Sequence, residues 1–203
     1  RRVGVHAVIR DNMNRDYMNR DYFEGIYADG PDPWGFETSA YERRKYDLTL
    51  AALPRRQYRR ALEPGCSIGV LTADLAGRCD AIEAWEPIDA PRRAADERTP
   101  DHVLVRDAIL GEAEPLPGAR IDLIVLSEVL YYLPADRLEG AVDKLIDQAE
   151  PGADVVAVHW RHAIAGMELD GDGVHERLAE MARLDVIGSW IQADFRIDVL
   201  RLR

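Results

Sequence analysis

Residues 60–69 read Arg-Ala-Leu-Glu-Pro-Gly-Cys-Ser-Ile-Gly, and this stretch decides the fold that the sequence predicts. Its first four residues form a short strand-like run that ends at Pro64-Gly65, a dipeptide typical of a turn. A helix is predicted immediately afterwards, over 68–77. A strand, a tight glycine-containing turn and a helix, in this order, are typical of the first unit of a parallel α/β sheet.

The same alternation continues outward from this unit. The clearest strand is the run Ile121 to Leu126, because it is almost continuously apolar, as in a buried parallel sheet. A helix follows it, with apolar residues at helical spacing as far as Ala149, and Pro151-Gly152 is predicted to end that helix. The remaining elements are strands over 81–85, 102–105 and 155–160 and helices over 90–98 and 135–149.

The end of the chain departs from this alternation. Two strand-like runs, 184–191 and 194–202, are separated by a turn so short that only an antiparallel hairpin can connect them. The fold class predicted is therefore α/β, a Rossmann-like, doubly wound, mostly parallel sheet with a C-terminal antiparallel hairpin and an N-terminal helical cap.

The N-terminal segment differs from the rest in composition. Residues 1–37 are polar, rich in aromatic residues and rich in turn signals, which predicts a cap of loops and short helices. Thr38 or Ser39 is expected to cap a helix that runs to about Leu53, where Pro54 closes it. The apolar face of this helix is predicted to contain Tyr41, Leu48 and Ala52.

Length and composition suit one compact domain. The chain has 203 residues, of which 47% are hydrophobic, and this is enough for one substantial core. We expect a single domain over 1–203, with a cap or lid over 1–53 and the core over 54–203. No apolar run reaches the roughly 20 residues of a membrane-spanning helix, and residues 1–14 do not resemble a signal peptide. A cytoplasmic location without a membrane partner is therefore predicted.

Charge and cysteine content narrow the possible partners. A formal net charge of -11 disfavours a nucleic-acid partner, because an acidic surface repels phosphate backbones. The dense basic cluster is expected to be a solvated helix end and loop, and it consists of Arg55, Arg56, Arg59 and Arg60. Cys66 and Cys79 do not have the spacing of metal ligands, so no metal is expected. The sequence does not indicate an oligomeric state.

The turn after the first strand contains a cofactor motif. Glu63, Gly65 and Gly69 resemble the motif of class I S-adenosylmethionine-dependent methyltransferases, in which an acidic residue at the strand end precedes G-C/S/T-G-x-G. Ser67 stands where the family has its middle glycine. Gly65 permits a sharp turn and Gly69 a close approach of ligand and helix, while the acidic side chain can accept a hydrogen bond from the cationic methionine moiety. The absence of G-x-G-x-x-G argues against a nicotinamide cofactor.

Acidic residues also follow the second and third predicted strands. Glu86 ends the second strand, where a carboxylate can accept hydrogen bonds from both ribose hydroxyls. Asp107 follows the third, at the place where the resemblance implies an Asp that binds the adenine amino group. The predicted cofactor, S-adenosylmethionine, would thus be held by Glu63, Gly65, Cys66, Gly69, Glu86, Asp107, Ala108 and Ser127.

A second resemblance is more specific. Glu128-Val129-Leu130-Tyr131-Tyr132-Leu133 follows the fourth strand, and Asp32-Pro33-Trp34 lies upstream. Together they resemble the nodulation-type (NodS-like) N-methyltransferases, which methylate an amino sugar on an oligosaccharide. The resemblance covers residues 32 to about 150. It implies that Trp34, Tyr41 and Tyr46 close over the cofactor, whereas packing of their helix onto the sheet is the alternative role.

Candidate catalytic residues are those predicted at the carboxyl ends of strands four and five, where open α/β sheets bind ligands. Glu128 can orient an amine or accept its proton, and interaction with a helix dipole is its alternative role. Tyr131 and Tyr132 can line the acceptor pocket. His159 and His162 follow strand five and suit proton transfer, because histidine titrates near neutrality.

The sequence therefore predicts an S-adenosylmethionine-dependent methyltransferase with a small-molecule acceptor, preferentially an amine or amino-sugar nitrogen. Glu128, His159 and Tyr132 are the predicted catalytic residues. The alternatives are O-methylation of a small metabolite and a non-catalytic adenosylmethionine-binding or scaffold domain, which the altered loop at Ser67 would suit. A Rossmann oxidoreductase is disfavoured by the missing glycine motif and by the terminal hairpin.

Overall fold

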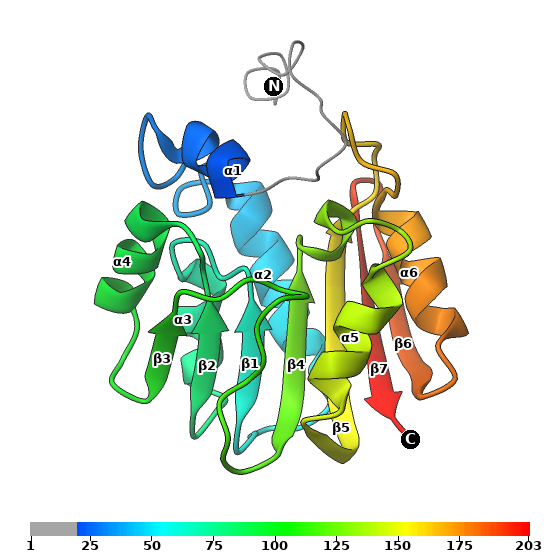
Figure 1. Ribbon diagram of the computed structural model, residues 1–203. Helices are drawn as coiled ribbons and strands as arrows, with labels where there is room; N and C mark the ends of the chain where they lie inside the picture. Colours follow the sequence, from blue (N-terminus) through cyan, green and yellow to red (C-terminus); the bar gives the residue numbers. More distant parts are fainter. Residues whose placement is uncertain (1–19) are drawn as a thin grey trace.

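The computed structural model describes residues 20–203, which form one seven-stranded sheet with helices on both faces (Figure 1). The strands are β1 Ala61–Pro64, β2 Ile82–Trp85, β3 Val103–Arg106, β4 Ile121–Ser127, β5 Ala149–Trp160, β6 Leu184–Ile191 and β7 Phe195–Leu202. The helices are α1 Arg20–Tyr27, α2 Ala40–Ala52, α3 Val70–Ala76, α4 Asp89–Arg98, α5 Leu138–Ile146 and α6 Gly171–Glu180, with a 3-10 turn, η1, at Leu130–Tyr132. None of these helices is long and apolar enough to cross a membrane.

The strand order is β3-β2-β1-β4-β5-β7-β6. β1 to β5 are mutually parallel, β7 pairs antiparallel with β5, and β6 pairs antiparallel with β7. The order reverses between β1 and β4, so the carboxyl ends of these two strands flank the position where doubly wound sheets bind ligands. The predicted architecture, including the C-terminal hairpin and the N-terminal cap, is confirmed.

Two apolar layers enclose the sheet, and β4 contributes to both of them. Along β4, Ile124 and Leu126 join the core cluster that contains α5 and α6, whereas Leu123 and Val125 join the cluster that contains α2, α3 and α4. All four side chains are fully buried. Burial on both faces explains why this strand has a nearly continuous apolar sequence rather than an alternating one.

Two elements differ from the sequence prediction. Residues from Ala149 onward belong to β5 and not to the preceding helix, because Ala149 pairs with Ile121 at the start of β4. A register shift follows this pair, and such an irregularity allows Pro151 within a strand. Helix α6 was not predicted, because Gly171 and Gly173 in its first turn are poor helix formers.

The buried face of α2 also differs from the prediction. The helix begins after Ser39, whose side chain accepts a hydrogen bond from the Glu42 amide, as expected. Its buried residues, however, are Glu42, Lys45, Tyr46, Thr49 and Ala52, while Tyr41 and Leu48 are only partly buried. The predicted apolar residues do pack on the core, but the expectation that charged residues lie on the opposite face was wrong, because Lys45 is buried between Glu42 and Glu128 and pairs with both.

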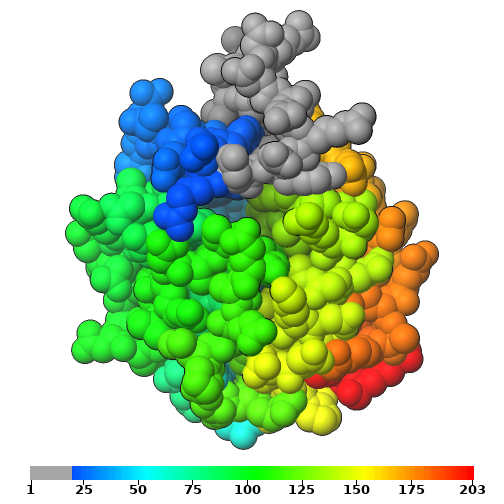
Figure 2. Space-filling view, in the orientation of Figure 1, coloured from blue at the N-terminus to red at the C-terminus, as the bar shows by residue number. Residues whose placement is uncertain are grey.

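Helix α1 lies at the carboxyl end of the parallel strands. Figure 2 shows this segment as a blue cap directly on the green surface formed by the middle of the chain. The Tyr27 hydroxyl lies 2.7 Å from Oγ of Ser67, and Nη2 of Arg20 lies 2.5 Å from Oδ1 of Asp107. These contacts join the cap to the loops after β1 and β3. The predicted lid extended to residue 1, and residues 1–19 lie outside the described residues.

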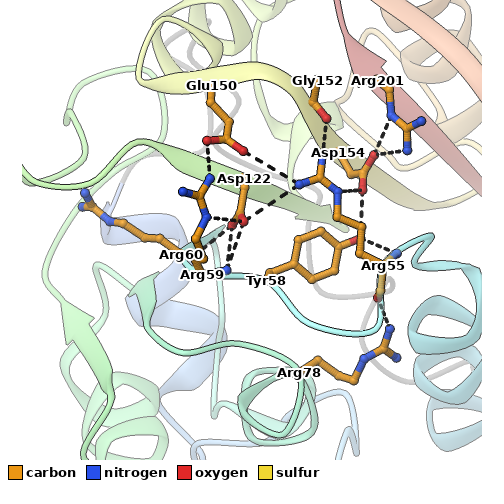
Figure 3. A network of polar contacts seen from close by, with 10 residues as sticks. All are labelled: Arg55, Tyr58, Arg59, Arg60, Arg78, Asp122, Glu150, Gly152, Asp154 and Arg201. Carbon is orange, nitrogen blue, oxygen red and sulfur yellow. Dashed lines mark hydrogen bonds and ion pairs between the residues drawn. The ribbon is translucent and has the colours of Figure 1, made fainter.

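The arginine cluster that follows α2 lies at the amino ends of the strands (Figure 3). Arg56 and Arg59 are exposed, as expected, but Arg55 and Arg59 also contact the carboxylates of Glu150 and Asp122. Arg60 pairs with Glu83 at 2.8 Å. Asp122 and Glu83 are buried. The cluster therefore compensates buried acidic residues, and its positive charge is largely neutralised.

Candidate active site

A cavity of about 260 Å³ lies between the carboxyl ends of the parallel strands and the N-terminal cap. Eight of the predicted cofactor residues line it, namely Trp34, Tyr46, Glu63, Gly65, Cys66, Glu86, Ala108 and Ser127. Glu128 and Tyr132 of the predicted catalytic set line it as well. Residues predicted on separate strands thus surround one space, because the carboxyl ends of parallel strands share one edge of the sheet.

The loop after β1 owes its shape to glycines that make close contacts. Gly65 has φ 76, and a Cβ on it would lie 2.3 Å from Cγ1 of Val129. Gly69 has φ 73, and a Cβ on it would lie 2.9 Å from Cα of Ala95 in α4. Both glycines therefore permit close packing of backbone and side chains within this chain, near the cavity. Gly69 does not line the cavity, so its observed close approach is to helix α4 and not to the cavity.

Ser67 occupies the position of the family's middle glycine. It adopts the left-handed conformation, with φ 48, which is uncommon for residues other than glycine. Its amide donates to Oε2 of Glu86 at 3.1 Å, and its hydroxyl lies 2.7 Å from the Tyr27 hydroxyl. The serine thus gives the loop a contact with the cap that a glycine could not make.

Two buried carboxyl groups, those of Glu63 and Glu86, line the cavity. Burial raises the pKa of Glu63 to about 7, and the neighbouring Thr72 hydroxyl offsets only part of this rise. Burial also raises the pKa of Glu86 to about 7, although its carboxylate accepts hydrogen bonds from the amides of Ile88 and Ser67. Both side chains would become more stable as anions if a ligand supplied a cation or hydrogen-bond donors.

Asp107 and Ala108 follow β3. Ala108 lines the cavity, but Asp107 does not, and 48% of the Asp107 side chain is exposed. Its carboxylate pairs with Arg20 at 2.5 Å and lies 3.7 Å from Arg92. The structure therefore places the predicted adenine ligand at the rim of the site, beneath α1.

At the end of β4, Glu128 has positive φ, 57, and its carboxylate has several partners. Lys45 from α2 contacts Oε1 at 2.5 Å, while Oε2 accepts hydrogen bonds from the Tyr131 hydroxyl and, at 2.9 Å, from the Trp160 amide. Lys45 also pairs with Glu42 at 2.8 Å. Glu128, Lys45 and Glu42 all line the cavity, and together they carry one net negative charge when all are ionised.

The ion pair keeps Glu128 and Lys45 charged. Burial acts to raise the pKa of Glu128, but the attraction of Lys45 and the hydrogen bonds to the carboxylate lower it below its ordinary value. Burial likewise acts to lower the pKa of Lys45, but Glu128 and Glu42 raise it above its ordinary value. At neutral pH Glu128 is consequently a fixed carboxylate, and its three bonds leave about one lone pair available to a ligand.

Of the three aromatic residues implied by the family resemblance, two line the cavity and one does not. Trp34 and Tyr46 line the cavity. Tyr41 does not, and it packs edge-on against the rings of Trp160 and Phe195, with centroids 6.1 and 5.9 Å away. Tyr41 therefore has the alternative role considered from the sequence, which is to pack α2 onto the sheet.

The two candidate histidines lie outside the cavity lining. His159 is fully buried, and its Nε2 accepts a hydrogen bond from the Leu130 amide at 3.3 Å. Burial and the nearby His175 and Lys45 hold the pKa of His159 well below its ordinary value. His162 is half-exposed, and its Nε2 lies 2.9 Å from Oδ1 of Asp194. This placement does not bring either imidazole into the cavity lining.

Sequence reasoning missed the partners of Glu128 and the contribution of α1. Lys45 and Glu42 have i,i+3 spacing on a helix, which usually indicates a solvated pair. Tyr22, Phe23 and Tyr27 line the cavity from a segment without a recognised motif. The aromatic richness of this segment was the available signal, and it predicted a cap without naming these residues.

The cavity residues fit S-adenosylmethionine. Oε2 of Glu63 is buried, and no described residue hydrogen-bonds to it, so a donor on a bound ligand would satisfy it. A cationic ligand suits a cavity that contains Glu63, Glu86 and the ionised Glu128. Glu63 would hold the methionine end of the cofactor and Glu86 the ribose hydroxyls, as the sequence predicts.

Comparisons with known proteins identify the family to which this chain belongs. Residues 12–190 match the family model of Nodulation protein S (NodS). Nodulation protein S of Rhizobium tropici is 31% identical over 77% of this chain and 70% of its own, and that of Sinorhizobium fredii is 29% identical over 80% of both.

Solved structures show the same fold. The N-methyltransferase NodS of Bradyrhizobium japonicum WM9, in complex with S-adenosyl-L-homocysteine, superposes with a TM-score of 0.75 at 24% identity, covering 84% of this chain and 92% of that one. A putative methyltransferase from Pseudomonas syringae has a TM-score of 0.67 at 35% identity, covering 80% and 99%. The chain belongs to the Nodulation protein S (NodS) family of S-adenosylmethionine-dependent methyltransferases.

Proposed function

We propose that this enzyme methylates the nitrogen of a small-molecule amine, with an amino sugar as the preferred class of acceptor. The observation that carries the proposal is the ionised Glu128 carboxylate in the cavity, held there by Lys45. When bound, S-adenosylmethionine supplies an electrophilic methyl group. Glu128 would accept a hydrogen bond from the amine N–H and thereby direct the nitrogen lone pair.

The surroundings of Glu128 favour an amine over a hydroxyl acceptor. A neutral amine is nucleophilic without prior proton removal, whereas a hydroxyl benefits from a general base with a pKa near neutrality. Beside Glu128, whose pKa is lowered, Lys45 and Tyr131 have raised pKa values, and His159 lies outside the cavity lining. Orientation of the acceptor is therefore a better-supported role for Glu128 than proton uptake.

Tyr132 and the cap complete the proposed acceptor side. Tyr132 lines the cavity, and its ring meets that of Phe23 from α1 edge-on, with centroids 5.1 Å apart. Aromatic walls bind the apolar faces of a ligand and exclude water from the reacting atoms. The NodS relatives support the amino-sugar class, because the family resemblance implies such an acceptor. Location in the cytoplasm and the lack of nucleic-acid or membrane partners remain predictions.

An acceptor screen with the Glu128→Gln variant tests this proposal. Glucosamine and other amines are compared with matched hydroxyl compounds such as glucose. We expect methylation of amines, and a kcat that falls about 10- to 100-fold in Glu128→Gln because the acceptor is misaligned. The Kd for S-adenosylhomocysteine should stay within about twofold.

Glu139→Gln provides the matched control, since Glu139 pairs with Arg177 on the exposed surface of α5 and α6. This variant should keep the wild-type kcat. Methylation restricted to hydroxyl compounds would refute the proposed acceptor. Full activity of Glu128→Gln would refute the proposed role of Glu128.

A further inference from the structure

A chain of buried polar groups runs from the C-terminal hairpin to the turn after β4. Oδ2 of Asp198 on β7 lies 2.8 Å from Nδ1 of His175 on α6. Nε2 of His175 lies 3.2 Å from Nδ1 of His159 on β5, and Nε2 of His159 lies 3.3 Å from the Leu130 amide in η1. Asp198 is 1% exposed, and the other three residues are fully buried.

The chemistry of these groups fixes the direction of the chain. The Leu130 amide can only donate, so Nε2 of His159 must be unprotonated and its proton must be on Nδ1. That proton is donated to Nε2 of His175, which leaves the proton of His175 on Nδ1, facing Asp198. Each link is satisfied when both imidazoles are neutral. The lowered pKa of His159, caused chiefly by burial, agrees with this assignment.

Arg196 anchors the far end of the chain. Its guanidinium contacts both carboxylate oxygens of Asp198, with Nη2 2.8 Å from Oδ2 and Nε 3.2 Å from Oδ1. Burial acts to raise the pKa of Asp198, but His175, Ser189 and Arg196 lower it below its ordinary value. Asp198 is therefore an ionised acceptor, which suits the end of a chain in which every imidazole donates toward it.

The near end of the chain holds residues that face the acceptor. Leu130 begins η1, two residues after Glu128. The ring of Tyr131, whose hydroxyl donates to Glu128, meets the ring of His159 edge-on with centroids 5.3 Å apart. The Glu128 backbone has the left-handed conformation, with φ 57, which persists only where the surroundings hold it. The bond from Leu130 to His159 is one of the contacts that hold this turn.

Close packing keeps His159 in place. A Cβ on Gly171, the first residue of α6, would lie 2.2 Å from the Trp160 carbonyl oxygen and 3.0 Å from Cβ of His159. Within residues 20–203, no residue of α6, β6 or β7 lines the cavity. These elements can therefore influence the cavity only through other residues, such as those of the hydrogen-bond chain.

We propose that His159, His175 and Asp198 are positioning residues, and that their directed hydrogen-bond chain fixes the turn from Glu128 to Tyr132 for methyl transfer. This role deepens the proposed function and rests on Glu128 being the group that orients the acceptor. It replaces the proton-transfer role predicted for His159. The histidines do not exchange protons with substrate, and they act by holding the Leu130 amide in one geometry.

Ring nitrogen-15 spectra of the histidine-labelled wild-type enzyme test the chain without any acceptor. Both His159 and His175 should carry a proton on Nδ1, and His159 should stay neutral from pH 6 to 8, a range of about one unit either side of neutrality. A proton on Nε2 of either ring, or a charged His159, would overturn the proposal. If the predicted tautomers are found but amines are not methylated, only the proposed acceptor class fails.

Substitutions at position 175 test whether the chain positions the turn. His175→Phe keeps a ring but removes the acceptor for Nδ1 of His159, whereas His175→Gln retains an acceptor oxygen near the position of Nε2. With S-adenosylhomocysteine bound, the Leu130 amide should exchange at least about tenfold faster in His175→Phe. Its kcat should fall about 10- to 100-fold, while the Kd for S-adenosylhomocysteine stays within about twofold.

His175→Gln should recover most of the protection and of the kcat. The control is His102→Phe. His102 is exposed, contacts the Ala76 carbonyl oxygen and has no part in the hydrogen-bond chain of His159, His175 and Asp198. Equal Leu130 exchange and equal kcat in His175→Phe and His175→Gln would refute the chain. If His175→Phe does not fold, the wild-type tautomers and the exchange rate of His175→Gln still decide the question.

Discussion

The two ends of the sheet both contain buried carboxyl groups, but these groups are paired at one end and incompletely paired at the other. At the amino end, Asp122 and Asp154 are 2% and 0% exposed, and both contact arginines. At the carboxyl end, Glu63 and Glu86 are equally buried, at 2% and 5%, but no described residue forms a salt bridge with either. Burial alone therefore does not distinguish the active end from the structural end.

At the amino end the compensation of charge is extensive (Figure 3). Oδ1 of Asp154 accepts hydrogen bonds from Arg201 at 2.7 and 3.0 Å, while its Oδ2 lies 3.2 Å from Arg55 and accepts the Tyr58 hydroxyl at 3.0 Å. Asp122 accepts hydrogen bonds from the backbone amides of Arg59 and Arg60 and from the guanidinium of Arg59. Such networks join segments distant in sequence and leave little capacity for a ligand.

At the carboxyl end the incomplete pairing is a property of a ligand site. Glu63 has a buried oxygen without a partner among residues 20–203, and burial raises the pKa of both Glu63 and Glu86 to about 7. Glu128 is the exception at this end, because Lys45 pairs with it inside the cavity. The paired carboxylates therefore hold the framework together, and the incompletely paired ones are the groups that we propose for cofactor binding.

Lys45→Met should have the largest effect, because it leaves the carboxylates of Glu42 and Glu128, at the carboxyl end of the sheet, without their cation. Removing the cation leaves Glu42 and Glu128 buried side by side, and the free energy of unfolding should fall by about 3 to 5 kcal/mol. Denaturant unfolding measures this change. Lys144→Met on the exposed side of α5 is the control, and restoring part of the stability with Glu42→Gln in the Lys45→Met background would confirm charge repulsion as the cause. A Lys45→Met protein as stable as wild type would contradict the pairing.

Asp154→Asn tests the opposite end. It removes the charge that Arg55 and Arg201 share, and because both arginines are partly exposed we expect a loss of about 2 to 3 kcal/mol in the free energy of unfolding. The Kd for S-adenosylhomocysteine should not change, since the network lies away from the cavity. Asp185→Asn, which breaks the exposed pair with Arg203, should be indistinguishable from wild type. A marked loss of cofactor affinity in Asp154→Asn would show that the two ends are coupled.

Glu86→Ala should affect binding more than stability. Loss of the bonds to the ribose hydroxyls should weaken binding of S-adenosylhomocysteine by about 2 kcal/mol, or about 30-fold in Kd. The unfolding free energy should change little, because the removed carboxylate is costly to bury without a ligand. Calorimetric titration gives the affinity, with Glu97→Ala on the exposed side of α4 as the control. An unchanged Kd would remove Glu86 from the cofactor site.

The pH dependence of stability tests the raised pKa values of Glu63 and Glu86 without a ligand. Because burial raises the pKa of Glu63 and Glu86 from 4.5 to about 7, the folded state binds more protons than the unfolded state between these values. The free energy of unfolding should therefore fall as pH rises through this window, by up to about 1.4 kcal/mol per pH unit for each of the two groups. The measurement is the difference between wild type and the Glu63→Gln/Glu86→Gln variant, in which this slope should be absent. If the difference in unfolding free energy between the two proteins does not depend on pH, the pKa values of Glu63 and Glu86 are not raised in the free enzyme.

Much of the fold was predictable because its signals are local. The apolar run Ile121–Leu126 and the turn at Gly65 act through neighbouring residues, so strand and turn assignments hold. Where a local signal conflicted with distant packing, the prediction was wrong. The strand that begins at Ala149 pairs with Ile121, and helix α6 has two glycines in its first turn despite their poor helix propensity.

The sequence by itself determined which carboxylates end neighbouring strands, and this brought Glu63, Glu86 and Glu128 to one cavity. Parallel strands make this possible, because their carboxyl ends always meet at one edge. Tertiary structure alone decided that Lys45, 83 residues from Glu128 in sequence, is its partner, and that His159 is buried outside the cavity lining. Pairing of buried charges and imidazoles depends on how helices pack on the sheet, which no local spacing specifies.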